Sequence, residues 1–279
     1  MEYYIRGGKL TWPVNLCHDF RYGKIMYNQL DQFIGRSLRL YGEYSQGEAD
    51  IFGQIVKPGH IVVEAGANIG SHTIHLAQLA GEQGQVWAFE PQRLVFQLLA
   101  GNVALNSLTN VHCLQKCLIG SGKRTIPVPV LDVNRINNWG GVELEHSAEG
   151  EPVEAITIDS LDLPGCDFLK IDVEGMELQV LQGAEETIRK YQPVIYAEAD
   201  REDKKDALFA YLRSHGYRLY RHEPPLYNPD NYFHNPENVF KVDKILEDGR
   251  KLALQIVSYN VLCKPKNAPF RFEGFEEIE

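Results

Sequence analysis

The sequence predicts an α/β fold in which a mainly parallel sheet is covered by helices on both faces. From about Ile61 onward, short apolar runs of strand length alternate with amphipathic runs of helix length, which is the pattern of βαβ units. The composition agrees with a globular protein that buries a core, because 44% of the 279 residues are hydrophobic and 24% are charged.

The expected elements follow in chain order. In the first half we expect strands at residues 61–63, 85–91 and 111–119, and helices at residues 71–80 and 93–106. In the second half we expect strands at residues 167–171, 193–199, 217–222 and 252–263, and helices at residues 176–191 and 204–214. Gly81 and Gly216 lie just past the ends of two of these helices, where glycine is favoured.

Three segments interrupt the alternation. Residues 1–50 are rich in aromatics and glycine without a clear period, and we interpret them as an N-terminal extension or cap before a domain at 51–279; Ser45 could cap a helix that starts near Gln46. Residues 221–240 combine Pro, Asn and aromatic residues, which predicts a loop inserted as a pocket wall. Residues 131–152 form a third long loop.

Charge and cysteine content argue against several classes of partner and site. The net charge is −10 and no Lys/Arg-rich run is present, so a nucleic-acid partner is not expected. Five scattered cysteines without a C-x-x-C pair argue against a disulfide framework or a zinc knuckle and fit a reducing compartment. The N-terminus lacks a secretory pattern, and no apolar run is long enough for a bilayer. We therefore expect a cytoplasmic protein without a membrane partner; homo-oligomerisation stays open.

The turn "EAGANIGS" at residues 64–71 carries the first functional signal. A dinucleotide site would read G-x-G-x-x-G, whereas here Asn68 and Ser71 stand at the second and third glycine positions. Glu64, just before the first glycine, would also repel a pyrophosphate. The turn therefore disfavours an NAD-type oxidoreductase and favours a ligand with positive charge.

The second strand ends in Glu90, a position from which a carboxylate can bind ribose hydroxyls. A ribose, a cationic part near the glycine turn and the lack of a diphosphate together describe S-adenosylmethionine. The alternative interpretation is that Glu64 and Glu90 are solvated acids at strand ends.

Three motifs, in this order and at these separations, resemble the FkbM family of S-adenosylmethionine-dependent methyltransferases: "GANIG", "FEP" and "KIDVEGME". The resemblance covers roughly residues 41–265. It implies the Rossmann-like class I methyltransferase fold, whose seven-stranded sheet is mostly parallel with the last strand antiparallel. It also implies O-methylation of hydroxyls on polyketides, sugars and related secondary metabolites.

The resemblance also implies a set of cofactor contacts. The methionine end would lie against Glu64, Gly66, Asn68, Gly70 and Ser71, the ribose on Glu90, and the adenine beside Pro91, Gln92, Cys117 and Leu118. Asp172 is expected at the cofactor too, and Tyr44 and Glu48 would close over it. One departure is Ala199, where relatives are expected to carry an Asn that offers a donor and an acceptor to substrate.

The candidate catalytic residues are Asp172, Glu174 and Glu198, at the carboxyl ends of two strands that the class I order places side by side, with Asp200 nearby. An alcohol is a poor nucleophile, so one carboxylate could act as a general base. Alternatively Asp172 and Glu198 could hold Mg²⁺, which would lower the pKa of the substrate hydroxyl; we favour the base. The structural alternative pairs Lys170 with a carboxylate and places Glu174 at a helix start.

The remaining polar candidates lie mostly in the 221–240 loop. His222 and His234 are rival bases, and Asn228, Asp230, Asn231 and Asn238 could bind a polyhydroxylated substrate or could simply form turns. His72 and His75 lack a third ligand for a metal site, and His215 fits a helix end.

The sequence thus predicts an O-methyltransferase for a hydroxyl of a sugar or small secondary metabolite. Two alternatives remain: an N- or carboxyl-methyltransferase, and a cofactor-binding protein without catalysis.

Overall fold

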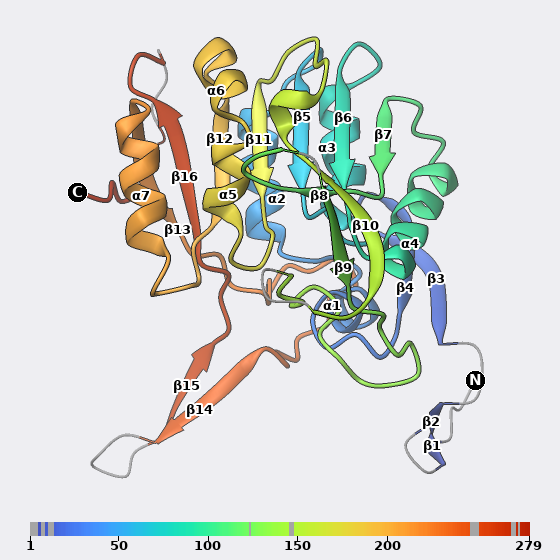
Figure 1. The fold of residues 1–279 in the computed structure, drawn as a ribbon. Coiled ribbons are helices and arrows are strands. Elements are labelled where there is room, and N and C mark those ends of the chain that lie inside the picture. The colour runs from blue at the N-terminus through green and yellow to red at the C-terminus, as the bar shows by residue number, and fades with distance from the viewer. Residues whose placement is uncertain are drawn as a thin grey trace.

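The computed structural model describes residues 5–6, 9–10, 14–122, 124–144, 148–245, 251–268, 272 and 274–279. Its centre is a seven-stranded sheet (Figure 1). In spatial order the strands are β13 (Tyr217–His222), β16 (Asn260–Pro265), β12 (Val194–Glu198), β11 (Phe168–Ile171), β5 (Ile61–Ala65), β6 (Gln85–Phe89) and β7 (Val111–Leu114).

Strand direction in this sheet matches the prediction. The neighbours from β12 to β7 are all parallel, and β16 is antiparallel to both β12 and β13, between which it lies. The last strand in the chain is therefore the antiparallel one. The middle strands β5 and β11 are almost entirely buried, as expected for strands covered on both faces.

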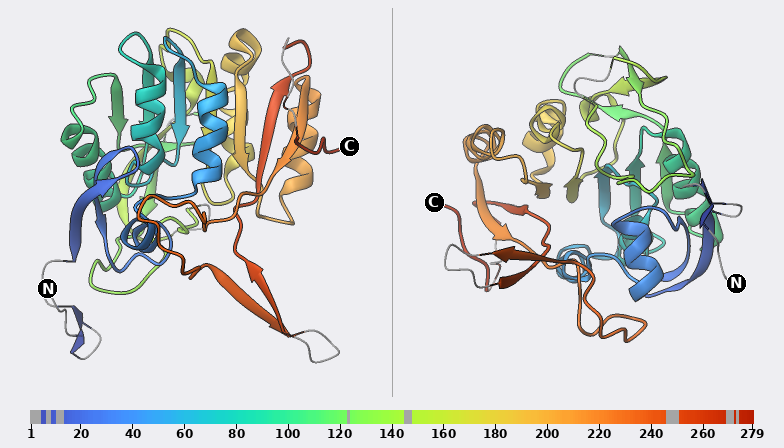
Figure 2. Two further views of the ribbon diagram at one scale, coloured as in Figure 1. Left: turned by 180° about the vertical axis from the view of Figure 1, so that it is seen from behind. Right: turned by 90° about the horizontal axis from the view of Figure 1, so that it is seen from below.

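Helices cover both faces of the sheet, as Figure 2 shows from behind and from below. One face packs against α2 (Gln46–Ile55), α3 (Ser71–Ala80) and α4 (Arg93–Leu105). The other face packs against α5 (Glu177–Gln182), α6 (Glu185–Tyr191) and α7 (Lys205–Ser214). The expected domain boundary at residue 50 falls within α2.

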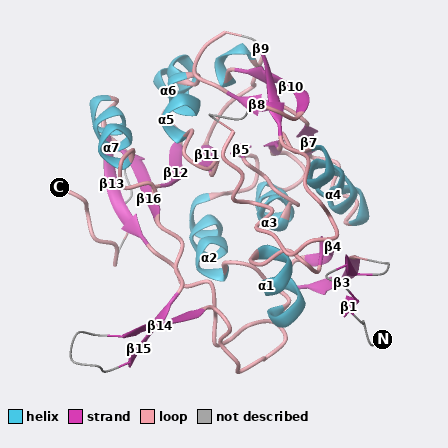
Figure 3. Ribbon diagram, turned by 60° about the horizontal axis from the view of Figure 1, so that its bottom comes forward, coloured by secondary structure: helices cyan, strands magenta, loops and turns pink. Residues whose placement is uncertain are grey.

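Smaller elements surround this core (Figure 3). They are the hairpins β1–β2 (Ile5–Arg6, Lys9–Leu10), β3–β4 (Asn15–Phe20, Gly23–Asn28) and β14–β15 (Lys241–Ile245, Lys251–Gln255), the sheet of β8 (Cys117–Leu118), β9 (Arg124–Val128) and β10 (Glu151–Ile156), the helix α1 (Ile34–Tyr41) and the short 3₁₀ helix Ile158–Ser160. The β14–β15 hairpin extends away from the body.

Several expected elements are divided. The strand expected at 111–119 becomes β7 and β8, and the one at 252–263 becomes β15 and β16. The helix expected at 176–191 breaks into α5 and α6 at Gly183, where a Cβ would lie 2.0 Å from the carbonyl oxygen of Ile119. Ser45 does precede α2, but its hydroxyl donates to the Glu48 carboxylate (2.9 Å) and caps no backbone N–H.

Candidate active site

A cavity of about 640 Å³ opens at the carboxyl ends of β5, β11 and β12. This is the edge at which open α/β sheets bind ligands. Segments distant in sequence form the other walls: residues from α1 and α2, the loop at 138–143, and residues 256–260 just before and at the start of β16. In Figure 3 this edge of the sheet faces the viewer, with α1 and α2 beside it.

The glycine turn brings backbone to the cavity wall. Gly66 has φ +80°, and its N–H donates to the carbonyl of Phe89 on the neighbouring strand (3.0 Å). A Cβ on Gly66 would lie 1.8 Å from the carbonyl oxygen of Asp172, so only glycine fits. Asn68 also has positive φ (+50°), a conformation that Asn adopts more readily than most residues.

Glu90 is buried behind this turn. Its carboxylate accepts hydrogen bonds from the backbone N–H of Asn68 (3.1 Å) and of Gln92 (2.8 Å). Burial raises the pKa of Glu90 to about 7, against the lowering effect of these two bonds. Gln92 donates to the carbonyl of Trp139 (3.0 Å), while its own Oε1 is buried without a hydrogen-bond partner. That oxygen is an acceptor available to a ligand.

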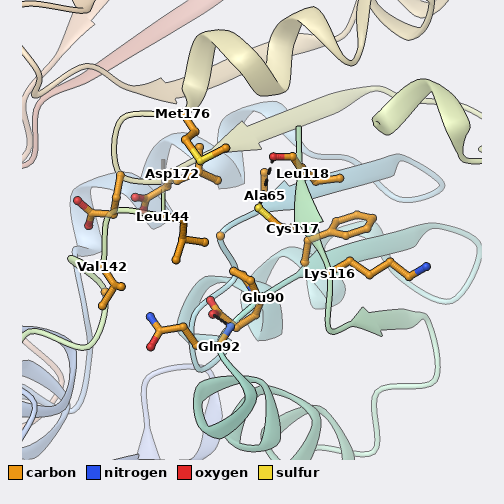
Figure 4. Close-up of a pocket in the computed structure, with 16 residues that line it drawn as sticks. Ala65, Glu90, Gln92, Lys116, Cys117, Leu118, Val142, Leu144, Asp172 and Met176 are labelled. Atoms are coloured by element: carbon orange, nitrogen blue, oxygen red, sulfur yellow. Dashed lines mark hydrogen bonds between the residues drawn. The ribbon is translucent and has the colours of Figure 1, made fainter. Parts of the chain in front are cut away.

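A narrow second pocket of about 50 Å³ continues from Glu90 and Gln92 (Figure 4). Cys117, Leu144 and Met176 surround it, and further apolar lining comes from Phe89, Pro91, Leu118, Val142 and Val173. The apolar lining of this slot, beside the Glu90 carboxylate and a free amide oxygen, suits the face and edge of a purine. The residues present therefore fit the adenosyl part of S-adenosylmethionine.

A buried ion-pair cluster lies at the other end of the glycine turn. Lys170 is 2% exposed; its Nζ donates to Asp172 Oδ2 (3.2 Å) and lies 4.0 Å from Glu64 Oε1. Thr73 donates to Glu64 Oε2 (2.6 Å). Burial raises the pKa of Glu64 to about 7, partly offset by Lys170 and Thr73. Burial alone would lower the pKa of Lys170, but the charges of Asp172, Glu64 and Glu48 raise it.

Tyr44, Glu48 and His72 form the wall next to this cluster. Burial raises the pKa of Glu48 and lowers that of His72 well below its usual value, so the imidazole is neutral near pH 7. His72 Nε2 lies 3.5 Å from Glu48 Oε2 and makes no hydrogen bond in the described structure. The ring of His72 faces that of Tyr44 at 5.7 Å.

Three carboxylates converge at the wall of the cavity formed by the ends of β11 and β12. Oxygens of Asp172, Glu174 and Glu198 all lie within 4.8 Å of one another. Arg201 borders the group: its Nη2 lies 2.9 Å from Glu174 and 3.0 Å from Glu143, and its Nη1 lies 3.2 Å from Asp200.

Burial and like charges raise the pKa of two of these carboxyl groups, Glu198 and Glu174. Burial, together with the charges of Asp172 and Glu174, raises the pKa of Glu198 well above its usual value. Burial and Asp172 likewise raise the pKa of Glu174 to about 8, although Arg201 opposes the shift. Glu198 Oε2 is buried and has no hydrogen-bond partner in the described structure.

The model of the FkbM methyltransferase domain matches residues 64–219, more than half of the chain. The chain belongs to the FkbM methyltransferase family. The matched segment contains the glycine turn, Glu90, Lys170 and the three carboxylates, and S-adenosylmethionine is the cofactor of this domain.

Two curated relatives agree with this assignment. The methyltransferase sdnD of Sordaria araneosa is 29% identical over 45% of this chain and 60% of its own length. The hexuronic acid methyltransferase AglP of Haloferax volcanii is 25% identical over 58% of this chain and 66% of its own. The chain thus spans less than two thirds of either relative. A crystal structure of methyltransferase FkbM from Methylobacillus flagellatus aligns with a TM-score of 0.46 at 17% identity, over 77% of this chain and 50% of that one.

Most of the cofactor residues that the sequence predicts lie together. Tyr44, Glu48, Glu64, Gly66, Asn68, Ser71, Glu90, Gln92 and Asp172 line the large cavity, and Pro91 and Cys117 line the small pocket. Gly70 directly precedes α3 and is not among the lining residues of either. The contacts of all these residues with the cofactor stay predictions.

The predicted substrate residues lie elsewhere. His222, Asn228, Asp230, Asn231 and Asn238 do not line the large cavity, to which their loop contributes Leu226. The loop docks on the N-terminal segment instead: Asn228 donates to Glu43 (2.9 Å), and Asn231 donates to two backbone carbonyls of its own loop. His222 shares a hydrogen bond with Tyr196 (2.7 Å), and burial lowers its pKa to about 4. A substrate contact for these residues stays a prediction.

Sequence reasoning missed several lining residues. Asn138, Glu143, Arg201 and Asn260 line the cavity, but none lies in a recognisable motif. The only sequence signal for the first two was the length of the 131–152 loop. Ala199 lies outside the large cavity, beside α5 and α7 in another pocket, so position 199 does not face the three carboxylates' cavity.

Among the described residues, no helix is both long and apolar enough to cross a bilayer.

Proposed function

We propose that this protein transfers the methyl group of S-adenosylmethionine to a hydroxyl of a sugar or another small secondary metabolite. The observation that carries the proposal is Glu198 Oε2, a buried carboxylate oxygen without a hydrogen-bond partner, on a side chain that lines the cavity beside Asp172 and Glu174. A buried acceptor of this kind is costly unless a ligand satisfies it. A hydroxyl proton would do so.

When bound, the cofactor supplies an electrophilic methyl carbon. The acceptor hydroxyl must lose its proton as it attacks, and in this proposal Glu198 receives that proton. Its raised pKa makes it a stronger base, once ionised, than a solvated carboxylate. Burial, together with the charges of Asp172 and Glu174, raises the pKa of Glu198, while Lys170 and Arg201 place two positive charges beside the group.

One of the two relatives supports a carbohydrate acceptor. The Haloferax volcanii protein is named as a methyltransferase for a hexuronic acid, which is a sugar derivative. The cavity of this chain is lined mainly by polar side chains, which suits a polyhydroxylated molecule better than an apolar one.

A divalent cation is the second candidate role for the same carboxylates. Three carboxylate oxygens within 4.8 Å of one another fit a hard cation such as Mg²⁺ in ligand type and spacing. A cation held there would lower the pKa of a bound hydroxyl. Activity that EDTA removes and Mg²⁺ restores would support this role over the base.

The test combines binding and turnover. Calorimetry with S-adenosylmethionine and S-adenosylhomocysteine measures cofactor affinity, and transfer of labelled methyl to a panel of sugars and hydroxylated metabolites measures activity. We expect micromolar binding, and turnover that falls at least a hundredfold in Glu198→Gln but not in the exposed control Glu202→Gln. Binding without transfer to any hydroxyl would favour a cofactor-binding protein without catalysis, and methylation confined to amines or carboxylates would contradict the O-methyltransferase.

A further inference from the structure

A second unpartnered polar group lies directly across from Glu198. Asn260, the first residue of β16, is the registered partner of Glu198 on β12. Directly paired residues of antiparallel strands place their side chains on the same face of the sheet. Asn260 is 8% exposed, lines the cavity, and its Nδ2 makes no hydrogen bond in the described structure.

Asn260 is also paired in register with His222 of β13, on its other side. The His222 Nδ1 is already engaged with the Tyr196 hydroxyl, so that ring nitrogen does not compete for the Asn260 amide. The unsatisfied donor of Asn260 and the unsatisfied acceptor of Glu198 therefore face the same cavity together. A buried donor and a buried acceptor that both lack partners can be satisfied by one ligand group that accepts a hydrogen bond from the first and donates one to the second.

We propose that Asn260 and Glu198 together bind the hydroxyl that is methylated, and that this hydroxyl belongs to an uncharged sugar. The inference rests on the proposed function and adds to it a substrate-binding residue and the charge of the acceptor. An alcohol oxygen carries one proton and two lone pairs. The proton is donated to Glu198 Oε2, one lone pair accepts from Asn260 Nδ2, and the other attacks the methyl carbon.

The step balances. The new O–CH₃ bond forms as the S–CH₃ bond of the sulfonium breaks, the bonding pair stays on sulfur as a neutral thioether, and the hydroxyl proton passes to Glu198. Asn260 stays neutral and keeps its hydrogen bond to the oxygen throughout.

The charges around the cavity argue for an uncharged acceptor. Among the described lining residues the cationic side chains are Lys170 and Arg201. Lys170 is engaged by Asp172, and Arg201 is engaged by Glu143, Glu174 and Asp200. Both cations are therefore already in ion pairs with the protein and do not offer an unpaired charge to a substrate carboxylate or phosphate. In the reacting state Glu198 is ionised, so an anionic sugar would meet negative charge on the same wall, a repulsive arrangement that selects against it.

The experiment uses the full chain and methyl glycosides of neutral hexoses as acceptors, with the matching methyl hexuronides as the charged set. We expect transfer to at least one neutral glycoside, with kcat/KM at least tenfold above that for its hexuronide. In Asn260→Ala and Asn260→Asp, kcat/KM should fall at least tenfold, mainly through KM, because one hydrogen bond to substrate is lost. Asn260→Ser, which keeps a donor, should retain more.

Gln255→Ala removes an exposed amide from β15 and is the matched control, expected to match the wild type. Binding of S-adenosylhomocysteine should change less than twofold in every variant, which shows that the fold and the cofactor site survive. Unchanged kcat/KM in Asn260→Ala, preference for hexuronides, or transfer only to non-sugar hydroxyls would overturn the inference while leaving O-methyl transfer intact. A wild type that binds no adenosyl ligand would instead overturn the proposed function itself.

Discussion

Gly66 lies so close to Asp172 that a Cβ on the glycine would be 1.8 Å from the aspartate's carbonyl oxygen. The two residues lie at the ends of neighbouring parallel strands, where the glycine turn leaves β5 and the acidic turn leaves β11. The contact joins the glycine turn to the turn that carries Asp172 and Glu174, and both turns line the large cavity. The backbone of one functional segment is therefore packed directly against that of the other.

Gly66→Ala should abolish adenosyl binding and destabilise the fold, because the new methyl has no room and φ +80° is strained for alanine. Calorimetry and urea unfolding measure both effects. Gly53→Ala is the matched control. Gly53 lies within α2 and its Cβ would meet nothing within 4 Å, so the free energy of unfolding should stay the same or rise by up to about 1 kcal/mol. Equal behaviour of the two variants would contradict the tight turn.

Glu90→Gln should weaken S-adenosylhomocysteine binding by roughly tenfold to a hundredfold. The change removes a carboxylate that would bind the ribose hydroxyls and also disturbs its bond from Asn68. Titration calorimetry gives the ratio, with the exposed Glu202→Gln as control. An unchanged dissociation constant would mean that the ribose lies elsewhere.

The stability of the ligand-free protein should fall as pH rises from about 4.5 to about 7. Burial raises the pKa of Glu64 from its usual 4.5 to about 7, so over this range the folded chain holds a proton that the unfolded chain has released. The contribution is present at low pH and is lost as pH passes through the folded-state pKa, a change of about 3 kcal/mol for this group. Urea unfolding from pH 5 to 7 should show a shallower slope in Glu64→Gln. Parallel slopes would rule out this titration.

The rate of methyl transfer should rise as pH passes through the raised pKa of Glu198, because Glu198 must be ionised to accept a proton. The charge of Glu174 contributes to that shift. Glu174→Gln should therefore move the rising limb of the kcat/KM profile to lower pH. A limb that moves upward, or does not move, would assign the proton to another group.

Glu43→Ala should destabilise the docking of the 221–240 loop. Glu43 is 3% exposed and accepts bonds from Arg21 (2.7 Å), Asn228 (2.9 Å) and the backbone N–H of Tyr232 (2.9 Å). Removing the carboxylate takes away the ion-pair partner of the partly buried Arg21 guanidinium, which then keeps its bond to the carbonyl of Asp230 (2.8 Å), at a cost of about 3 kcal/mol. Faster proteolysis within the loop and a lower Tm are the readouts. Asp19→Ala, which breaks an exposed pair with Lys24, should change neither.

The sheet and the cofactor edge were predictable because their signals are local. The apolar runs of β5, β6 and β11, and the glycine turn after β5, each lie within a few consecutive residues. The breaks were less predictable. Gly183 divides a helical pattern because of a carbonyl on the distant Ile119, and no local pattern records that contact.

The substrate wall was the least predictable part. Asn260 lies opposite Glu198 only because β16 enters the sheet beside β12. In the sequence, Asn260 is one residue of an expected strand, and no motif distinguishes it. The Asn-rich loop at 221–240 was predicted to bind substrate because its polar residues are close together in the sequence. In the structure Asn231 bonds within the loop, and Asn228 bonds the loop to Glu43.

The position of β16 has a consequence for biosynthesis. This strand is inserted between β12 and β13, which precede it in the chain, and its residues Val261 to Cys263 are fully buried. Until they leave the ribosome, β12 and β13 have no strand between them, and each presents an unpaired apolar edge. During synthesis these edges are therefore exposed to pairing with other chains. A chain that is truncated just before residue 260 should be prone to aggregation.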